Sequence, residues 1–128
     1  MITRFSVIQV NGVEPKFVSR PKVNGPVNVG DTITVSCQIR ADPIPDVCWK
    51  IGNTEIRKSD SNYVLKSEEK DDLVLECALE IKSVQMRDNG KSQISAKNIL
   101  AEVTCPFTII VQETGAKGLL FRVNFQNE

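Results

Sequence analysis

The stretch Asp42-Pro43-Ile44-Pro45-Asp46-Val47-Cys48-Trp49 carries the only tryptophan of the chain. Its two prolines fix backbone dihedrals and favour a turn, and the residues that follow, at 47–51, favour a strand. A turn that leads directly into a strand bearing a large aromatic side chain indicates a β-rich domain with an aromatic core.

Strand-like runs recur on both sides of this stretch. We predict strands at residues 16–19, 27–29, 32–39, 47–51, 63–66, 73–81, 93–97 and 102–111. Turn residues, mainly Gly, Asn and Pro, lie between these runs. Only residues 83–87 indicate a helical turn, so strands dominate the prediction.

Alternation within two of the runs indicates that each sheet has one buried face. Ile33, Val35 and Cys37 share one face of the run at 32–39. The corresponding face of the run at 73–81 carries Leu73, Leu75, Cys77, Leu79 and Ile81. Two such sheets must bury these faces against each other, which predicts an all-β sandwich of two antiparallel sheets.

Length and composition favour one soluble domain. The chain has 128 residues, of which 41% are hydrophobic and 25% charged. No window approaches the ~18 consecutive apolar residues of a membrane span, and residues 1–14 lack the features of a signal peptide. We therefore expect no membrane partner.

Charge and residue types argue against several classes of function. Lys plus Arg and Asp plus Glu both number 16, so no net field favours nucleic acid. The chain has no histidine, the commonest general base and a frequent zinc ligand. No hydrolase or phosphate-binding motif is present, and the acidic group at 68–72 is interpreted as a solvated loop. We predict a protein that is not an enzyme and uses no cofactor, metal or small-molecule substrate.

The four cysteines, Cys37, Cys48, Cys77 and Cys105, have no C-x-x-C spacing, which argues against a zinc site. We interpret them as small hydrophobic residues within strands. The alternative is one or two disulfides, which would form only in an oxidising compartment.

Several short stretches resemble one family when taken in order. They are Pro15-Lys16-Phe17-Val18, Val27-Asn28-Val29-Gly30-Asp31, the proline turn and strand at residues 42–49, Leu79-Glu80-Ile81-Lys82-Ser83-Val84 and Asp88-Asn89-Gly90. With Trp49 twelve positions after Cys37, they resemble an intermediate-set (I-set) immunoglobulin domain. The nearest likeness is to the intracellular domains of giant muscle proteins such as titin, twitchin and obscurin.

The resemblance implies an immunoglobulin-like β-sandwich with Greek-key connections over residues 15–112. Residues 1–14 would then be an N-terminal flank or linker, and residues 113–128 a C-terminal extension with a possible extra strand. The implied structural core comprises Cys37, Trp49, Leu79, Ile81 and Ile94.

This placement predicts the surroundings of two side chains. Because Trp49 would point inward, Cys48 should face solvent and be the most exposed and reactive of the four thiols. Asp88 would close the turn before the next strand, paired with an arginine or with backbone amides. Whether Arg87 is that arginine stays open.

The departures from the family pattern concern its two hallmarks. Ser92 stands where the family tyrosine would be, and Ile94 where the second bridging cysteine would be. The inter-sheet disulfide is therefore lost, with about 4 kcal/mol of stabilisation in the chain-entropy model. Such a domain suits a reducing cytosol. Pro106 removes a donor from a predicted strand, which implies a bulge or an edge position.

The C-terminal segment shows a strand pattern with one apolar face, formed by Leu119, Phe121, Val123 and Phe125. One hypothesis is that a partner completes this strand: a neighbouring domain, a second copy, or a sheet edge. The alternative is that this segment, and the run at residues 2–10, are linkers to adjacent domains of a longer chain.

The resemblance implies a protein-binding and load-bearing structural module of a muscle or cytoskeletal scaffold in the cytoplasm. Its partners would be other protein domains, including further copies of itself. The alternatives are an extracellular adhesion or receptor domain, and a regulatory module beside a kinase in a giant muscle protein.

Overall fold

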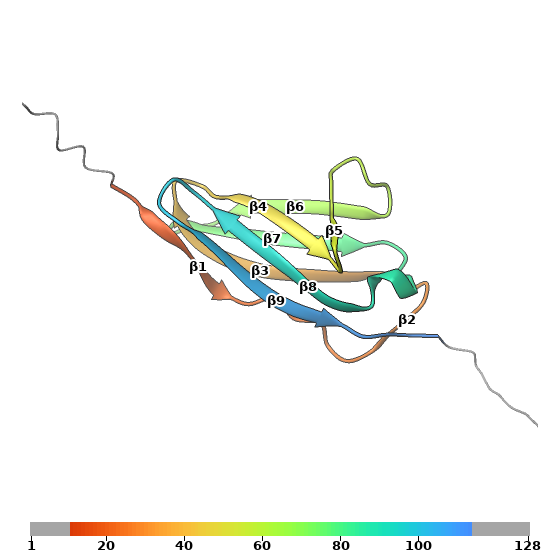
Figure 1. Cartoon of the computed structure of the whole chain (residues 1–128). Helices are drawn as coiled ribbons and strands as arrows, with labels where there is room; N and C mark the ends of the chain where they lie inside the picture. The colour runs from red at the N-terminus through yellow and green to blue at the C-terminus, as the bar shows by residue number, and fades with distance from the viewer. Residues whose placement is uncertain (1–10, 114–128) are drawn as a thin grey trace, which may run out of the picture.

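The chain folds as two four-stranded sheets packed face to face, as the computed structural model shows for residues 11–113 (Figure 1). The first sheet has the order β1-β3-β7-β6 and is antiparallel throughout. Its strands are β1 (Val13–Ser19), β3 (Ile33–Asp42), β7 (Val74–Ile81) and β6 (Tyr63–Glu69).

The second sheet has the order β5-β4-β8-β9 and is also antiparallel. Its strands are β5 (Thr54–Glu55), β4 (Asp46–Ile51), β8 (Gly90–Lys97) and β9 (Glu102–Ile109). The predicted all-β sandwich of two antiparallel sheets is confirmed.

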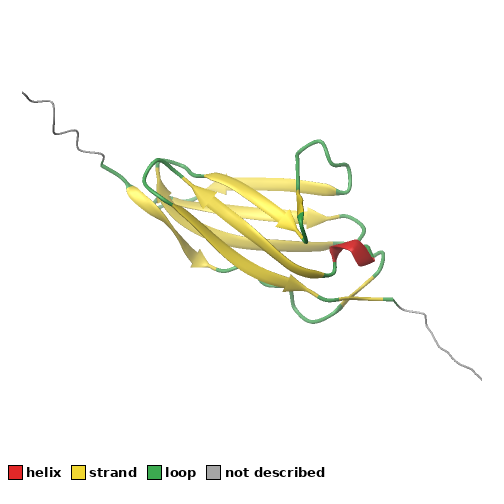
Figure 2. Cartoon of the chain, viewed as in Figure 1, coloured by secondary structure: helices red, strands yellow, loops and turns green. Residues whose placement is uncertain are grey.

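A third, two-stranded pairing joins β2 (Val27–Asn28) to β10 (Val111–Gln112), and these strands run parallel. Within the described part of the chain the helical element is one short 3-10 turn, η2 (Met86–Asp88), drawn in red in Figure 2. It overlaps the last two residues of the turn predicted at 83–87, and it starts three residues later and ends one residue later.

Strict alternation explains why the sheets pack as they do. Every second residue of β7 is buried, from Leu75 to Ile81, and β8 follows the same pattern with Ser92, Ile94 and Ala96. Because successive side chains of a strand point to opposite faces, each sheet presents one apolar face to the other. Trp49 and Phe107 fill the middle of that interface.

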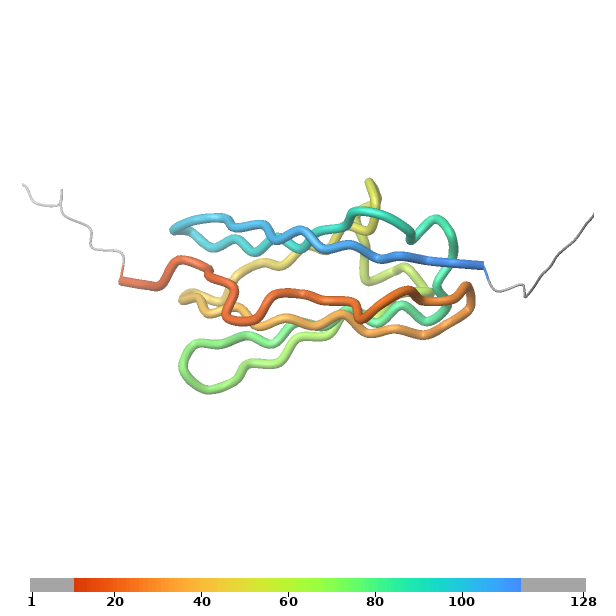
Figure 3. Tube along the Cα trace, turned by 90° about the horizontal axis from the view of Figure 1, so that it is seen from below, coloured from red at the N-terminus to blue at the C-terminus, as the bar shows by residue number. Residues whose placement is uncertain are grey.

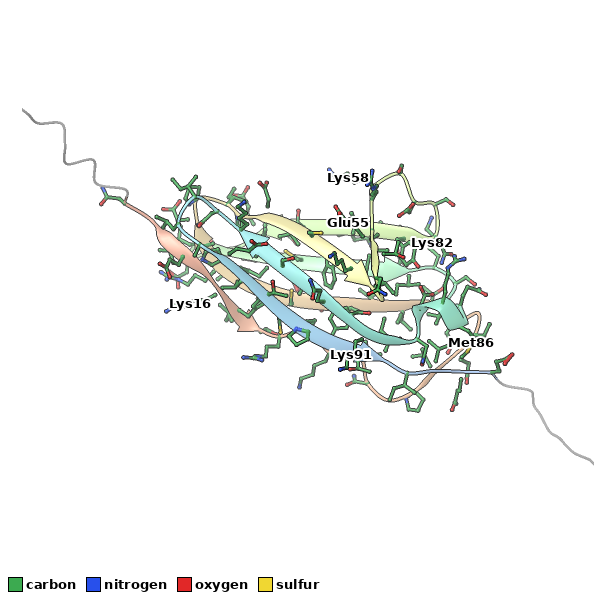
Figure 4. All side chains as sticks on the ribbon, in the orientation of Figure 1. Lys16, Glu55, Lys58, Lys82, Met86 and Lys91 are labelled. Atoms are coloured by element: carbon green, nitrogen blue, oxygen red, sulfur yellow. The ribbon has the colours of Figure 1, made fainter. Side chains whose placement is uncertain are left out.

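The described chain enters and leaves at opposite ends of the sandwich (Figure 3). We call the end where β1 begins the N-terminal pole; there Asn98 Nδ2 donates to the carbonyl oxygens of Val13, at 2.9 Å, and Pro43, at 3.2 Å. The C-terminal pole is the end where β10 stops, beside η2 with its half-exposed Met86 (Figure 4).

Leu73 was placed wrongly by its alternation with the residues of β7. The structure puts it in the turn before that strand, with φ of 63° and a side chain that is 44% exposed. Asp72 has φ of 64°, so two consecutive residues adopt the left-handed conformation and take Leu73 out of the strand. Its carbonyl oxygen accepts a hydrogen bond from the N–H of Ala41 at 3.0 Å.

Pro106 lies on the outermost strand of its sheet, which is one of the two predicted accommodations. The β8–β9 register continues without a bulge. Because Asn98 N donates to Ala101 O across the connecting turn, the alternation along β9 directs the main-chain nitrogen of Pro106 away from β8. The missing N–H therefore removes no hydrogen bond from the sheet.

Candidate functional site

All five candidate core residues lie between the sheets. Leu79, Ile81 and Ile94 are fully buried, Cys37 is 2% exposed and Trp49 is 3% exposed. The indole of Trp49 meets the ring of Phe107 edge to face, with centroids 5.9 Å apart and planes at 81°. Both rings come from the second sheet, Trp49 from β4 and Phe107 from β9, and they pack in the space between this sheet and the first one.

The thiols of the core are free and lie close together. Cys37 of β3 is directly opposite Cys77 of the neighbouring strand β7, and Cys105 of β9 faces them from the other sheet. A hydrogen bond with the Cys77 thiol, together with burial, raises the pKa of Cys37 well above its ordinary value. The sheets are therefore joined by packing among free thiols and apolar side chains.

Cys48 is half-buried whereas the other three cysteines are buried, so its expected exposure relative to them is observed. Its expected reactivity relative to the other three thiols stays a prediction. Burial, and then the neighbouring Glu55 carboxylate, raise the pKa of Cys48 (Figure 4 shows Glu55 on β5). A raised pKa leaves less thiolate at neutral pH, so the thiol reacts more slowly than an ordinary exposed cysteine.

The single tyrosine of the chain contacts the buried carboxylate of Asp88. The hydroxyl of Tyr63, at the start of β6, donates to Asp88 Oδ1 at 2.5 Å, and the N–H of Gln85 donates to Asp88 Oδ2 at 2.8 Å. Asp88 is fully buried. These two donors, a hydroxyl and a backbone amide, provide its carboxylate with hydrogen bonds inside the protein. Burial, followed by the hydrogen bond to Asp88, raises the pKa of Tyr63.

The pair β2–β10 closes one lateral edge of the sandwich, and we call it the seam. Val27 N donates to Ile110 O at 2.8 Å, and Val29 N donates to Gln112 O at 3.1 Å. The buried N–H of Val111 is satisfied by Asn89 Oδ1 at 2.8 Å. Because the two strands run parallel, the chain enters β2 and leaves β10 at opposite ends of the pair, so tension between the chain ends would load these bonds in shear.

The opposite lateral edge is open, and we call the hollow there the groove. It has a volume of about 500 Å³ and lies between β6, the edge strand of the first sheet, and the part of β4 that the short edge strand β5 does not cover. Trp49, Leu75 and Cys77 form its apolar floor. Val47 and Leu65 line its two sides, and both are only partly buried.

Several charged side chains on and beside the first sheet form ion pairs. Lys70 Nζ lies 3.2 Å from Glu68 Oε1 and 3.5 Å from Glu76 Oε1, and these carboxylates raise the pKa of Lys70. Arg40 lies 3.7 Å from Asp72. Within residues 11–113 there is no group of three or more ligating side chains suited to a metal ion. The same part of the chain contains no helix long and apolar enough to cross a membrane.

The candidate partner-binding residues Leu119, Phe121, Val123 and Phe125 lie outside the described residues, as does the run at 2–10. Sequence reasoning missed the Tyr63–Asp88 contact, the seam and the groove. The first joins residues 25 positions apart, and no spacing rule connects them. The seam and the groove depend on which strands end at the edges of the sheets.

The strand order, the buried tryptophan and the parallel seam can be compared with known families. The model of the immunoglobulin I-set domain matches residues 15–111. This chain belongs to the immunoglobulin I-set family. Domains of this family are typically structural modules without catalytic activity.

Relatives of this I-set domain include much longer proteins. Smooth muscle myosin light chain kinase of Gallus gallus is 28% identical over 106 residues, or 83% of this chain and 5% of that protein. Roundabout homolog 1 of Homo sapiens is 33% identical over 99 residues, or 77% of this chain and 5% of that protein. The chain thus spans about 5% of the length of each of these relatives.

Solved structures of muscle proteins share the fold. A chimeric titin Z1Z2 carrying an exogenous peptide from decorin has a TM-score of 0.68 at 21% identity, with 80% of this chain and 99% of that chain covered. Structures of titin, twitchin and obscurin-like 1 immunoglobulin domains are also similar. At these identities the likeness establishes the fold.

Proposed function

We propose that this I-set domain is a non-catalytic structural and protein-binding module that carries mechanical load in a muscle or cytoskeletal scaffold. The observation that carries the proposal is the seam. Its hydrogen bonds from Val27 and Val29 join β2, the second strand, to β10, the last strand of the described chain. A pull along the long axis must break such parallel bonds together rather than one after another.

A cytoplasmic location, in the sarcomere or cytoskeleton, agrees with the unbridged core. The four cysteines are free, and Ile94 occupies the position where a bridging cysteine would be needed. An I-set domain held by apolar packing does not depend on an oxidising compartment. The likeness to a smooth muscle kinase and to titin domains supports the same location.

Other protein domains are the proposed partners. The structure of titin M10 with an obscurin-like 1 immunoglobulin domain is a complex between two such domains, and its fold is that of this chain. The partner-binding segment proposed here is the apolar face formed by Leu119, Phe121, Val123 and Phe125.

Single-molecule stretching of a tandem polyprotein tests the load-bearing role. Val29→Pro removes the N–H that bonds to Gln112 and should lower the unfolding force. Ile99→Ala is the control, because Ile99 lies on an exposed loop away from the seam, and should leave the force unchanged. An unfolding force that is insensitive to Val29→Pro would contradict the proposal.

Two other functions have supporting observations. The 33% identity to Roundabout homolog 1 favours an extracellular adhesion or receptor domain, and the likeness to myosin light chain kinase favours a regulatory module beside a kinase. Thiol titration of the unfolded protein, purified without reductant, separates the first from the cytoplasmic proposal. Four free thiols support the cytoplasm, and two or fewer support secretion.

A further inference from the structure

The groove exposes part of the sandwich interior because β6 is not covered over its full length. Leu65, Ser67 and Glu69 of β6 lie directly opposite Leu79, Cys77 and Leu75 of β7, so their side chains point to the core side of the sheet. Nevertheless Ser67 and Glu69 are exposed. No strand of the second sheet lies over them in the described chain, since β5 ends at Glu55.

The main chain of β6 is available for pairing on the same side. Lys70 N donates to Val74 O, and Asn62 O accepts from Lys82 N, so residues with even numbers in this strand direct their main-chain groups toward β7. Leu65, Ser67 and Glu69 therefore direct their N–H and C=O groups outward from the sheet. An extended segment laid along this edge can exchange hydrogen bonds with all three residues.

Other edges of the sandwich are less suited to strand addition. The outermost strand β9 carries Pro106, which lacks an N–H. The edge strand β1 has two irregularities in its register, and β5 is only two residues long. The seven residues of β6 pair with β7 without a bulge or a proline, so β6 has the longest regular free edge.

The sequence beyond the described residues contains a segment that fits this surface. An added strand places every second side chain over the groove floor. In residues 119–125 those alternate positions carry only Leu, Phe, Val and Phe, whereas Leu120, Arg122 and Asn124 face the other way. The floor formed by Trp49, Leu75 and Cys77 is apolar, and a groove of about 500 Å³ has room for side chains of this size.

The segment must come from another molecule because one end of the groove is closed. Residues 56–62 cross there from one sheet to the other: Ile56 N donates to Trp49 O at 2.9 Å, and Asn62 O accepts from Lys82 N. This connection lies toward the C-terminal pole, where β10 leaves the domain (Figure 1). The groove opens toward the N-terminal pole, beside Ile44 and Pro45, so a strand entering it comes from a neighbour.

We propose that residues 119–125 of a second copy of this chain add as an antiparallel strand to the free edge of β6, with their apolar side chains over the groove floor. A strand that enters from the N-terminal pole runs opposite to β6, which gives the antiparallel pairing. Reciprocal exchange between two copies closes as a two-fold dimer. The proposal rests on the protein-binding part of the proposed function and identifies the partner and its surface.

Sedimentation of the full chain over a concentration series tests the dimer. We expect a monomer–dimer equilibrium that Phe121→Asp shifts at least tenfold toward monomer, because it puts a charge over the apolar floor. The matched control Asn124→Asp adds the same charge on the opposite face and should retain the dimer. On the groove side, Ser67→Pro removes an outward N–H and should give monomer, whereas Ser67→Ala should not.

Hydrogen exchange in the same full-length samples locates the contact. Amides of Leu65, Ser67 and Glu69 should become protected as the concentration rises, while Val64 and Lys66, already bonded to β7, should not change. A monomer at every concentration overturns the proposal, as does a dimer that protects β9 or β1 instead. Protection of the three amides that is independent of concentration would assign the segment to its own molecule and also overturn it. None of these outcomes affects the unfolding-force test of the seam.

Discussion

The two lateral edges of this I-set domain differ in how their backbone is used. At the seam, β2 and β10 join the sheets through hydrogen bonds from Val27 and Val29. At the groove, β4 and β6 face each other, and no such hydrogen bonds join them within the described chain. Trp49 lines the hollow between them. The same sandwich thus has one edge suited to resisting tension and one suited to accepting a further strand.

The difference arises from short pieces of sequence. The seam needs only two residues in each strand, with Asn89 supplying an acceptor to Val111 N. The groove remains open because β5 pairs with β4 only at Lys50 and Ile51 and leaves Val47 uncovered. The two edges therefore differ because of where strands end rather than because of the core.

Replacing Trp49 of the core should have the largest effect on stability. Trp49 lines the groove and packs against Phe107 of β9, the strand that leads to the seam. Trp49→Ala should lower the free energy of unfolding by about 3–5 kcal/mol, through lost burial and the cavity left behind. Urea titration followed by circular dichroism measures this change. Trp49→Phe should cost clearly less, and equal losses for both variants would show that packing volume is not the cause.

Weakening the seam alone should have an intermediate effect. Asn89→Ala leaves the buried N–H of Val111 without its acceptor, which should cost about 1–3 kcal/mol. The matched control is Asn24→Ala at an exposed loop position, with an expected change within about 0.5 kcal/mol. Thermal unfolding of both variants provides the comparison. A stability of Asn89→Ala equal to that of Asn24→Ala would mean that this contact does not hold the seam closed.

The contact that anchors β6 beside the groove should show a distinct pH dependence. Tyr63 has a raised pKa, so its hydrogen bond to Asp88 is fully present below the ordinary tyrosine value of about 10 and is lost as the pH rises through the higher folded value. Tyr63→Phe should cost about 1 kcal/mol at pH 7, because the hydroxyl is only partly buried. The difference between wild type and variant should fall as the pH rises above the ordinary tyrosine pKa of about 10. A difference that is constant from pH 7 to pH 11 would contradict the assignment.

The smallest expected effect concerns Cys48 on the outer face of β4. Because burial and Glu55 raise its pKa, alkylation at pH 8 should be slower than that of a model thiol. Glu55→Gln should speed the reaction with little change in stability, whereas Glu14→Gln, on a distant strand, should not. Mass spectrometry of the alkylated protein gives the rates. Faster labelling of Cys37, Cys77 or Cys105 in the folded protein would reverse the assigned order of exposure.

The fold was predictable because its strongest signals are local. Alternating residues such as Leu75, Cys77 and Leu79 required two buried faces, and Trp49 after a proline turn indicated where they meet. The same rule failed at Leu73, because alternation continues in the sequence after the backbone has turned to positive φ. A two-residue strand such as β5 has too few positions to show any period.

The candidate site was less predictable because it depends on pairing between distant residues. The absence of the family tyrosine at Ser92 was visible, but the hydrogen bond from Tyr63, on a different strand, to Asp88 was not. The family pattern set Cys37 against Ile94 of the other sheet, where a bridging cysteine would stand. The pattern did not indicate that Cys77, on the neighbouring strand of the same sheet, lies directly opposite Cys37. Edges are still harder to foresee, since an open edge is defined by a strand that does not extend far enough.

The central claim, that one edge is closed and the other open, can be tested directly by native-state hydrogen exchange on dilute, monomeric protein. The account predicts slow exchange for the amides of Val27 and Val29 at the seam and rapid exchange for Leu65, Ser67 and Glu69 at the groove. Equal protection at both edges, or faster exchange at the seam, would contradict it.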